Sequence, residues 1–486
     1  MATLGETTQK RDRHSVEGTR VDARVARWLP SVAVLLLLIL LYRFFRDYLR
    51  TGQLPPGPWQ LPVLGYLPWI DAEKPHESLT KLARRYGPIC SLRMGSVHTI
   101  LLSDPRTIRQ TLARDTFSGR AHLYVTHGIM KGYGIVCAEG DLWRDQRKFV
   151  AGCLREFGMT KIGPKRDKME KRIVQAVDEC ISVSSIEPLA LSIVPSLPPI
   201  LFSLNGKGMK NSSRRFIPRY NRTLLSLLEG IGKTHQVYHS LLEDYRDRIA
   251  KRDSSEVTSE SFLAAFDREM RKISEEVGYF TEPQLYHLLA DLFGAGTDTT
   301  LTTLRWFLLF MAAYPEEQRM IQKEMDQRPN SKDSPTLEDR SLLPRLEAAI
   351  AEAQRLRAVT PLGIPHRATS VRPRGYKVPK DSMIVPLLWA VHTDPAYWKD
   401  PLEFRPERFI AEDGTIFKPE AFLPFQAGKR VCIGEELARM ILFLFAGKIL
   451  DAFEVSVPSG TKADLEGECG ITLVPKLHQL TFTRRR

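Results

Sequence analysis

Cysteine is scarce in this sequence, and the few cysteines present are not paired. Only six occur among the 486 residues, widely scattered, with no CxxC motif and no histidine-rich partner at zinc spacing. This pattern argues against a disulfide scaffold and against a structural zinc site. Glycine (31) and proline (32) are too few for a fibrous repeat. Because 43% of the residues are hydrophobic and 26% charged, the chain is expected to bury a large core.

Acidic residues are outnumbered, since 70 Lys and Arg face 57 Asp and Glu and leave a net charge of +13. Such a surplus favours anionic surfaces, namely lipid head groups, an acidic partner protein or nucleic acid. However, the basic residues are spread along the chain, and no aromatic-basic module for RNA or DNA is visible. An unspecific contribution to solubility is therefore the plainer interpretation, and no nucleic-acid partner is expected.

One long hydrophobic run stands near the N-terminus. Residues 28–45 form an apolar run that is interrupted only by Arg43. Its length of 18 residues is close to the lower limit for a helix that crosses a bilayer. A cleaved signal peptide and a buried helix are the alternatives, but no small-residue cleavage site follows the run. We therefore predict an N-terminal tail (1–27) and a retained transmembrane anchor (28–45). Both flanks carry a net charge of +2, so the charge rule gives no orientation.

A proline-rich tether (46–60) follows the anchor, because Pro55, Pro56 and Pro58 cannot continue a helix. Residues 61–486 show many helical patterns, few strand-like runs and no second linker. They are interpreted as one large, mainly α domain with a small β region. The stretch 181–222 is atypical, since its five prolines and many serines suit a loop, and a loop of that length is uncommon inside a compact domain.

Cys432 stands in a loop suited to holding a metal from one side. Gly428 and Gly434 flank it and let the backbone approach a flat ligand, Phe425 begins the loop, and Arg430 can meet an acidic group. An apolar helix pattern follows, and its N-terminus favours a thiolate. Such a sulfur ligand suits iron in a porphyrin. The bland alternative is an inert buried cysteine.

This F-x-x-G-x-R-x-C-x-G pattern resembles the haem-binding loop of the cytochrome P-450 family. The resemblance implies the family's mainly α fold, haem b (iron protoporphyrin IX) with Cys432 as the axial ligand of the iron, and a monooxygenase reaction. Phe425, Gly428, Arg430 and Gly434 would then contact the cofactor.

Residues 281–314 predict one helix of some 30 residues, with Thr281 as N-cap and Pro315 as stop. A helix this long would cross the domain as a mostly buried rod. Its middle, residues 295–300, is rich in poor helix formers, which indicates a functional site. The alternative is close helix packing with threonines bonded to carbonyls. The family's [AG]-G-x-[DE]-T-T motif implies that Asp298 and Thr299 are catalytic and relay protons for O–O cleavage.

Two further sets of residues match family motifs. Glu352 and Arg355 share a helix face, a spacing common elsewhere in the chain, and the resemblance adds Arg408 to complete a structural Glu-Arg-Arg triad. A second set is expected to contact the haem propionates together with Arg430. Taken alone, each member would be explained more simply by a salt bridge at the surface. This set is Trp143, Arg147, Arg120 and His366.

Nothing in the chain resembles a flavin or NADPH domain, so the resemblance implies electrons from NADPH through a partner, NADPH–cytochrome P-450 reductase. The acidic residues of the tail and the tether after the anchor favour the endoplasmic reticulum membrane with a cytoplasmic catalytic domain over mitochondria. Dioxygen and membrane lipid are the other expected partners.

Four stretches, 123–130, 289–296, 303–309 and 438–442, resemble the arthropod ecdysteroid hydroxylases of the family. This implies hydroxylation of a sterol, at C25 of the side chain, in moulting-hormone biosynthesis. Met130, Ala295 and Leu362 are the candidates for lining a long apolar pocket. Alternatives are another ecdysteroid or xenobiotic hydroxylase of the family, and a catalytically impaired haem or sterol binder if the 181–222 region is defective or a gene-model artefact.

Overall fold

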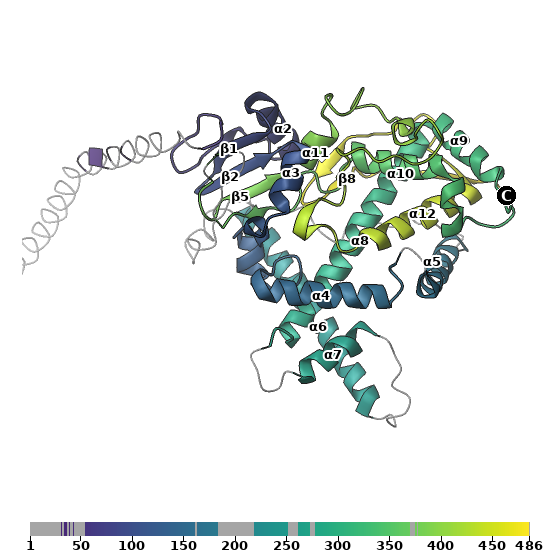
Figure 1. Ribbon diagram of the computed structural model, residues 1–486, viewed down its shortest axis with the longest axis horizontal. Coiled ribbons are helices and arrows are strands. Elements are labelled where there is room, and N and C mark those ends of the chain that lie inside the picture. Colours follow the sequence, from purple (N-terminus) through teal and green to yellow (C-terminus); the bar gives the residue numbers. More distant parts are fainter. Residues whose placement is uncertain are drawn as a thin grey trace, which may run out of the picture.

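The computed structural model describes residues 54–160, 163–182, 218–250, 261–272, 278–369, 375–376 and 378–485, with five single residues between 31 and 42. Helices dominate and the strands are short (Figure 1), which confirms the prediction of a mainly α fold with a small β region. The helices are α2 (Pro75–Tyr86), α3 (Pro105–Leu112), α4 (Gly140–Glu156), α5 (Pro164–Ser182), α6 (Pro218–Ala250), α7 (Phe262–Lys272), α8 (Glu282–Ala313), α9 (Pro315–Asp326), α10 (Pro344–Leu356), α11 (Leu388–His392) and α12 (Glu435–Ala452). Short 3-10 or π turns are η2 (Leu67–Trp69), η3 (Asp115–Phe117), η4 (Tyr124–Ile129), η7 (Leu337–Leu342), η9 (Pro406–Phe409) and η10 (Gly428–Arg430).

A five-stranded sheet forms one side of the molecule, in the order β1-β2-β5-β4-β3. β1 (Ile89–Met94) and β2 (Val97–Leu102) form an antiparallel hairpin. β5 (Met383–Pro386) joins β2 in parallel, with Ile100 opposite Ile384, and then pairs antiparallel with β4 (His366–Arg367), which pairs with β3 (Gly119–Arg120). Two small hairpin-like sheets complete the fold: β6 (Phe453–Ser456) with β9 (Thr481–Arg484), and β7 (Gly467–Cys469) with β8 (Leu473–Pro475).

Helix α8 runs through the molecule (Figure 1) and contacts α6, α9, α10 and α12 along its length. The prediction of one long helix is confirmed, since the Thr281 side chain caps it by accepting from the backbone N–H of Gln284, and Tyr314 ends it. Its C-terminal half packs with α10 and α12 in the largest apolar cluster, and its N-terminal half packs with α4, α6 and α7. The middle differs from a buried rod, because residues 293–297 are exposed.

The prediction of an N-terminal anchor (28–45) falls almost entirely on residues outside those described. Among the described residues, no helix is both long enough and apolar enough to cross a bilayer. Within the atypical stretch, residues 183–217 also lie outside the described part, while residues 181–182 end α5 and residues 218–222 begin α6. The loop prediction was therefore wrong at both ends of the stretch, where the chain is helical.

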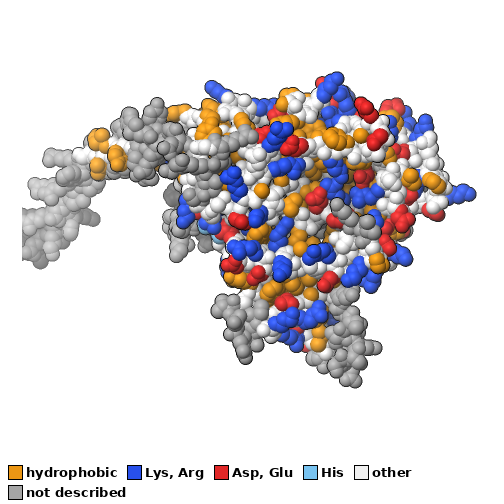
Figure 2. All heavy atoms as spheres, viewed as in Figure 1, with side chains coloured by type: hydrophobic (Ala, Val, Ile, Leu, Met, Phe, Trp, Pro, Cys, Tyr) orange, Lys and Arg blue, Asp and Glu red, His pale blue; other side chains and the backbone are white. Residues whose placement is uncertain are grey.

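The basic surplus does not gather in one place on the face shown in Figure 2, where Lys and Arg side chains lie among Asp and Glu. Many of these opposite charges pair locally, as Arg319 does with Glu316 and Lys272 with Glu269. Exposed pairs of this kind contribute little to stability.

Candidate haem site

The Cys432 loop turns back on itself before α12. The backbone N–H of Cys432 donates to the carbonyl of Phe425 at 3.0 Å, and η10 lies between them. Gly428 has a φ of +79°, and a Cβ on it would lie 2.2 Å from the carbonyl oxygen of Leu112 in α3. The need for glycine at this position therefore comes from the protein's own packing. Gly434 is the N-cap of α12, and a Cβ there would have only the Cys432 Sγ, at 4.0 Å, within contact.

The Cys432 thiol is solvent-accessible yet surrounded by protein on its other sides. This desolvation raises the pKa of Cys432, although the backbone N–H of Gly434 and the charge of Arg147 act in the opposite direction. The helix N-terminus that we expected to favour the thiolate therefore does not lower the pKa below its ordinary value. A metal ion bound to the sulfur would remove the proton outright.

Arg430 is buried beside the loop and donates to three backbone carbonyls. Its guanidinium carbon lies 4.0 Å from the ring centre of Trp143, a cation–π contact. Burial, with the nearby Arg120 charge, lowers the pKa of Arg430 to about 8. The three acceptors are the carbonyls of Ser118 (2.8 Å), Ile135 (3.2 Å) and Ala138 (2.6 Å).

Arg120 and Arg147 bring two more positive charges to the same region. Arg120 is buried in β3 and donates from Nε to the carbonyl of Val136 at 2.8 Å, and burial lowers its pKa to about 10. Arg147 lies one turn beyond Trp143 on α4 and donates to the carbonyl of Val431 at 2.6 Å. Among the described residues, no carboxylate lies within ion-pair distance of the side chain of Arg120, Arg147 or Arg430.

Two buried polar atoms in this region lack a hydrogen-bond partner among the described residues, namely Trp143 Nε1 and His366 Nε2. His366 lies in β4, and its Nδ1 donates to the carbonyl of Phe117 at 2.8 Å. Burial, followed by the Arg120 charge, lowers the pKa of His366 to about 3, so its ring is neutral at neutral pH. Buried polar atoms normally have partners, so Trp143 Nε1 is a donor available to a bound ligand, whereas Nε2 of the neutral His366 ring can only accept.

These residues fit haem. Three cationic side chains without carboxylate partners and the orphaned N–H donor of Trp143 suit a ligand that carries acidic groups. A cysteine preceding α12 supplies a sulfur donor for iron. The structure thus brings six residues into one region through ring contacts, strand pairing and hydrogen bonds to neighbouring stretches of backbone, namely Cys432, Arg430, Trp143, Arg147, Arg120 and His366.

The predicted catalytic threonine belongs to a regular turn of α8. Thr299 Oγ1 donates to the carbonyl of Ala295 at 2.7 Å, and Thr303 Oγ1 donates to the carbonyl of Thr299 at 2.8 Å. Both threonine hydroxyls therefore bond to helix carbonyls, as the alternative interpretation of residues 295–300 expects. Asp298 is half-buried on the same turn, and a Cβ on Gly296 would meet nothing within 4 Å.

Sequence reasoning missed two polar residues of α8 that hold the loop preceding α4. Asp291 Oδ2 is buried and accepts from the backbone N–H groups of Ile135 (2.7 Å) and Val136 (2.8 Å). Gln284 exchanges two hydrogen bonds with the backbone of Gly134. Burial raises the pKa of Asp291 to about 6. The carbonyls of this same loop accept from Arg430 and Arg120, so α8 positions both arginines indirectly.

Glu352, Arg355 and Arg408 meet in the interior, away from the Cys432 loop. Glu352 and Arg355 are fully buried in α10, with Arg355 Nε 2.6 Å from Glu352 Oε2. Arg408 of η9 donates to Glu352 Oε1 at 3.1 Å. The network ties α10 to the segment that leads to the Cys432 loop, which is a scaffold position.

Among the described residues, no hydrogen bond and no common apolar cluster joins the three candidate pocket residues. Met130 is half-buried just after η4, Ala295 is exposed on α8, and Leu362 packs against the apolar cluster of the five-stranded sheet. A surface pocket lined in part by Tyr314 and Leu465 contains none of the three.

Residues 55–189 and 204–482 match the sequence model of the family described as Cytochrome P450. The chain belongs to the cytochrome P450 family. Cytochrome P450 306a1 of Drosophila melanogaster is 38% identical and covers 96% of both chains. Cytochrome P450 18a1 of the same species is 34% identical over 93% of this chain and 91% of its own. Human Cytochrome P450 2J2 is 32% identical over 89% of this chain and 91% of its own.

Membership makes the chain a cytochrome P450 monooxygenase and implies a haem-thiolate cofactor. The family match is interrupted at residues 190–203, which lie inside the stretch 181–222 that looked atypical in sequence.

Proposed function

We propose that this cytochrome P450 hydroxylates a sterol, at C25 of the side chain of an ecdysteroid precursor. The supporting observation is similarity along nearly the whole chain to Cytochrome P450 306a1 of Drosophila melanogaster. The stretches 123–130, 289–296, 303–309 and 438–442 also resemble the insect ecdysteroid 25-hydroxylase Phantom. Met130, Ala295 and Leu362 are proposed to line the substrate pocket.

When bound, haem activates dioxygen so that one oxygen atom enters a C–H bond. The protein's own groups hold the cofactor and control protons. Cys432 would hold the iron through its sulfur. Arg120, Arg147 and Arg430 would bind the acidic groups with the N–H donors that backbone carbonyls leave free. Trp143 Nε1 adds one more donor.

Thr299 and Asp298 are proposed to move protons on the α8 side of the site. Thr299 holds its hydroxyl proton toward the carbonyl of Ala295, so this hydrogen bond must break before the hydroxyl can donate into the site. Asp298, which is half-buried, would return a proton from solvent.

Electrons are proposed to come from NADPH through NADPH–cytochrome P-450 reductase, at the endoplasmic reticulum membrane with the catalytic domain in the cytoplasm. The N-terminal segment 28–45 is the proposed anchor.

The test is product analysis with purified full-length protein, the reductase and a ketodiol sterol that lacks side-chain hydroxyls. We expect a 25-hydroxylated product. A hydroxyl at another position would replace the assignment by another hydroxylase of the family, and substrate binding without any product would leave a haem or sterol binder. The reduced carbon-monoxide spectrum of the wild-type protein and of Cys432→Ser tests the sulfur ligand separately.

Thr299→Ala separates the hydroxylase from the binder. A hydroxylase should keep its substrate-induced spectral change while product formation falls by roughly 100-fold and consumed NADPH appears as hydrogen peroxide. A binder would show the same spectral change and the same lack of product in both proteins.

A further inference from the structure

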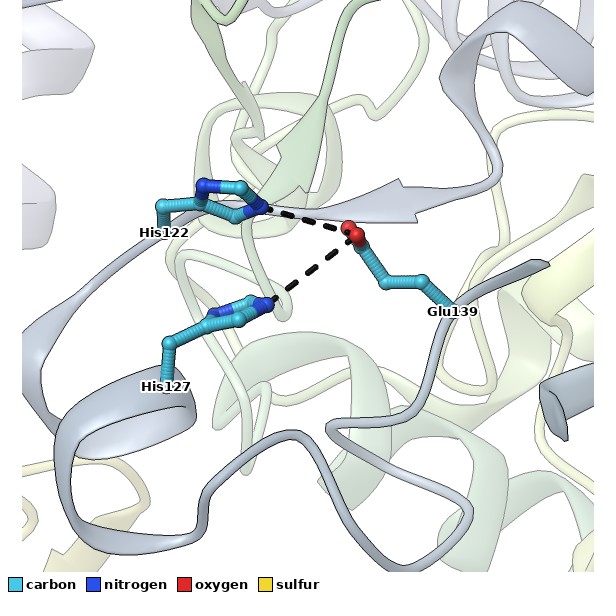
Figure 3. Close-up of side chains that lie close together, drawn as sticks. All are labelled: His122, His127 and Glu139. Carbon is cyan, nitrogen blue, oxygen red and sulfur yellow. Dashed lines mark ion pairs between the residues drawn. The ribbon is translucent and has the colours of Figure 1, made fainter. Parts of the chain in front are cut away.

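Two histidines and one glutamate lie together outside the haem site (Figure 3). His122 follows β3, His127 lies in η4, and Glu139 is the N-cap of α4. Glu139 Oε2 lies 3.5 Å from His122 Nε2 and 4.0 Å from His127 Nε2. One ligand atom from each residue lies within 4.8 Å of the other two. All three side chains therefore point at one small volume.

The surroundings of His127 suit the tautomer that carries its proton on Nδ1. Thr126 Oγ1 lies 2.7 Å from the carbonyl of Ala121 and 3.1 Å from that of Leu123, and either can take its single hydrogen. When one of them does, Thr126 Oγ1 accepts from His127 Nδ1 at 2.8 Å. The free lone pair of Nε2 then faces the carboxylate oxygen of Glu139. Two lone pairs directed at each other favour a cation between them.

Hydrogen bonds hold the glutamate ligand in place. Arg367 Nη2 lies 2.6 Å from Glu139 Oε2, and the Arg367 Nε and the backbone N–H of Arg120 donate to Oε1. With Thr126 on His127, this gives two of the three side chains an outer partner of the kind that orients metal ligands.

We infer that His122, His127 and Glu139 form a binding site for one zinc ion. Imidazole nitrogens and a carboxylate are zinc ligands, at roughly 2.0–2.2 Å from the metal, which puts tetrahedral ligand atoms about 3.3 Å apart. The observed 3.5 and 4.0 Å close to that value with small side-chain rotations. Magnesium and calcium prefer oxygen ligands and are disfavoured. Because His122 is about half-exposed, solvent reaches the site, and water would take the fourth ligand position of the zinc ion.

Zinc at this site would tie three separate segments together. These segments are the end of β3, the η4 turn and the start of α4. Two residues of the haem site are close to them in sequence, since Arg120 lies in β3 and Trp143 lies in α4. No cysteine-based zinc motif occurs in the sequence, and the separation of 17 residues between His122 and Glu139 follows no short ligand pattern. Only the fold brings these ligands together.

The test is calorimetric titration of zinc chloride into the haem-loaded, chelator-treated protein, in which haem occupies Cys432. We expect one equivalent of zinc to bind and to raise the melting temperature, whereas magnesium chloride does neither. His122→Ala and His127→Ala should each weaken zinc binding at least about tenfold. His478→Ala is the matched control and should bind zinc unchanged, because His478 Nδ1 bonds to the nearby carbonyl of Lys476 and the residue is no part of the cluster.

X-ray absorption at the zinc edge provides a second readout, with two imidazoles expected per zinc in the wild-type protein and one in His122→Ala. Because His122 is exposed, this variant should melt like the wild type without zinc. No stoichiometric binding, or equal affinity in the wild type and both ligand variants, would overturn the site.

Discussion

Replacing Arg355 by lysine would keep the buried positive charge and remove the planar fork that holds it. All five N–H groups of Arg355 are used in the structure. Nε and one Nη2 hydrogen go to Glu352, and the others go to the carbonyls of His392 (2.6 Å), Pro401 (2.8 Å) and Glu403 (3.2 Å). Lysine offers three donors from one nitrogen, so at least two of these bonds are lost.

The expected loss of stability follows from that difference. Each acceptor left buried without a donor costs roughly 1–3 kcal/mol, so the two together cost roughly 2–6 kcal/mol in the free energy of unfolding. The guanidinium also lies 5.1 Å from the ring centre of Trp398, a stacking contact that an ammonium group keeps less well. Arg319→Lys is the matched control, because Arg319 pairs with Glu316 in the open and such pairs contribute at most about 1 kcal/mol.

The measurement is urea unfolding of both variants, followed by far-UV circular dichroism so that the haem spectrum does not enter. Arg355→Lys should unfold at clearly lower urea with an unchanged slope, and Arg319→Lys should follow the wild type. If Arg355→Lys lies within about 1 kcal/mol of the control, the argument that the fork geometry stabilises the fold is wrong.

Two further predictions concern the hydrogen bonds of Asp291 and Gln284 in α8 to the loop before α4, which we call the clamp. The pKa of Asp291 rises from 3.8 to about 6 in the folded chain. Its own contribution to the free energy of unfolding is therefore greatest below pH 4 and falls by up to about 3 kcal/mol as the pH rises through 6. Asp291→Asn should lack this loss, and a stability difference from the wild type that does not grow between pH 4.5 and 7 would contradict the assignment. Gly134→Ala should destabilise by more than about 1 kcal/mol, because φ is +79° and the new Cβ would lie 2.1 Å from Asp291 Oδ2. In a thermal-melt double-mutant cycle the Gly134→Ala penalty should shrink beside Asp291→Ala, and strict additivity would exclude the clash.

The long helix and the Cys432 loop could be predicted because their determinants are local. Thr281 and Pro315 mark the ends of α8 within one stretch of sequence, and Phe425 to Gly434 lie within ten residues. The Glu352–Arg355 pair is local as well, but its burial is not, since its acceptors at His392 and Glu403 come from distant turns.

The clamp on the loop before α4 could not be predicted. Asp291 bonds to Ile135 across 156 residues of chain, and Gln284 bonds to Gly134 across 150. From sequence alone, a carboxylate on an amphipathic helix is expected to face solvent, so the burial of Asp291 could not be foreseen. The conformation of Thr299 was also open, because a hydroxyl on a helix can bond to the carbonyl four residues earlier or to a ligand, and sequence does not decide between them.

The pairing of β2 with β5 has a consequence for synthesis on the ribosome. β2 is complete at Leu102, but its parallel neighbour begins only at Met383, so some 280 further residues emerge before that edge is covered. Until then the apolar strand Val97–Leu102 presents unpaired backbone groups to other nascent chains. Truncated products ending before β5 should therefore be the aggregation-prone species, and holdase chaperones should be needed mainly in this interval of translation.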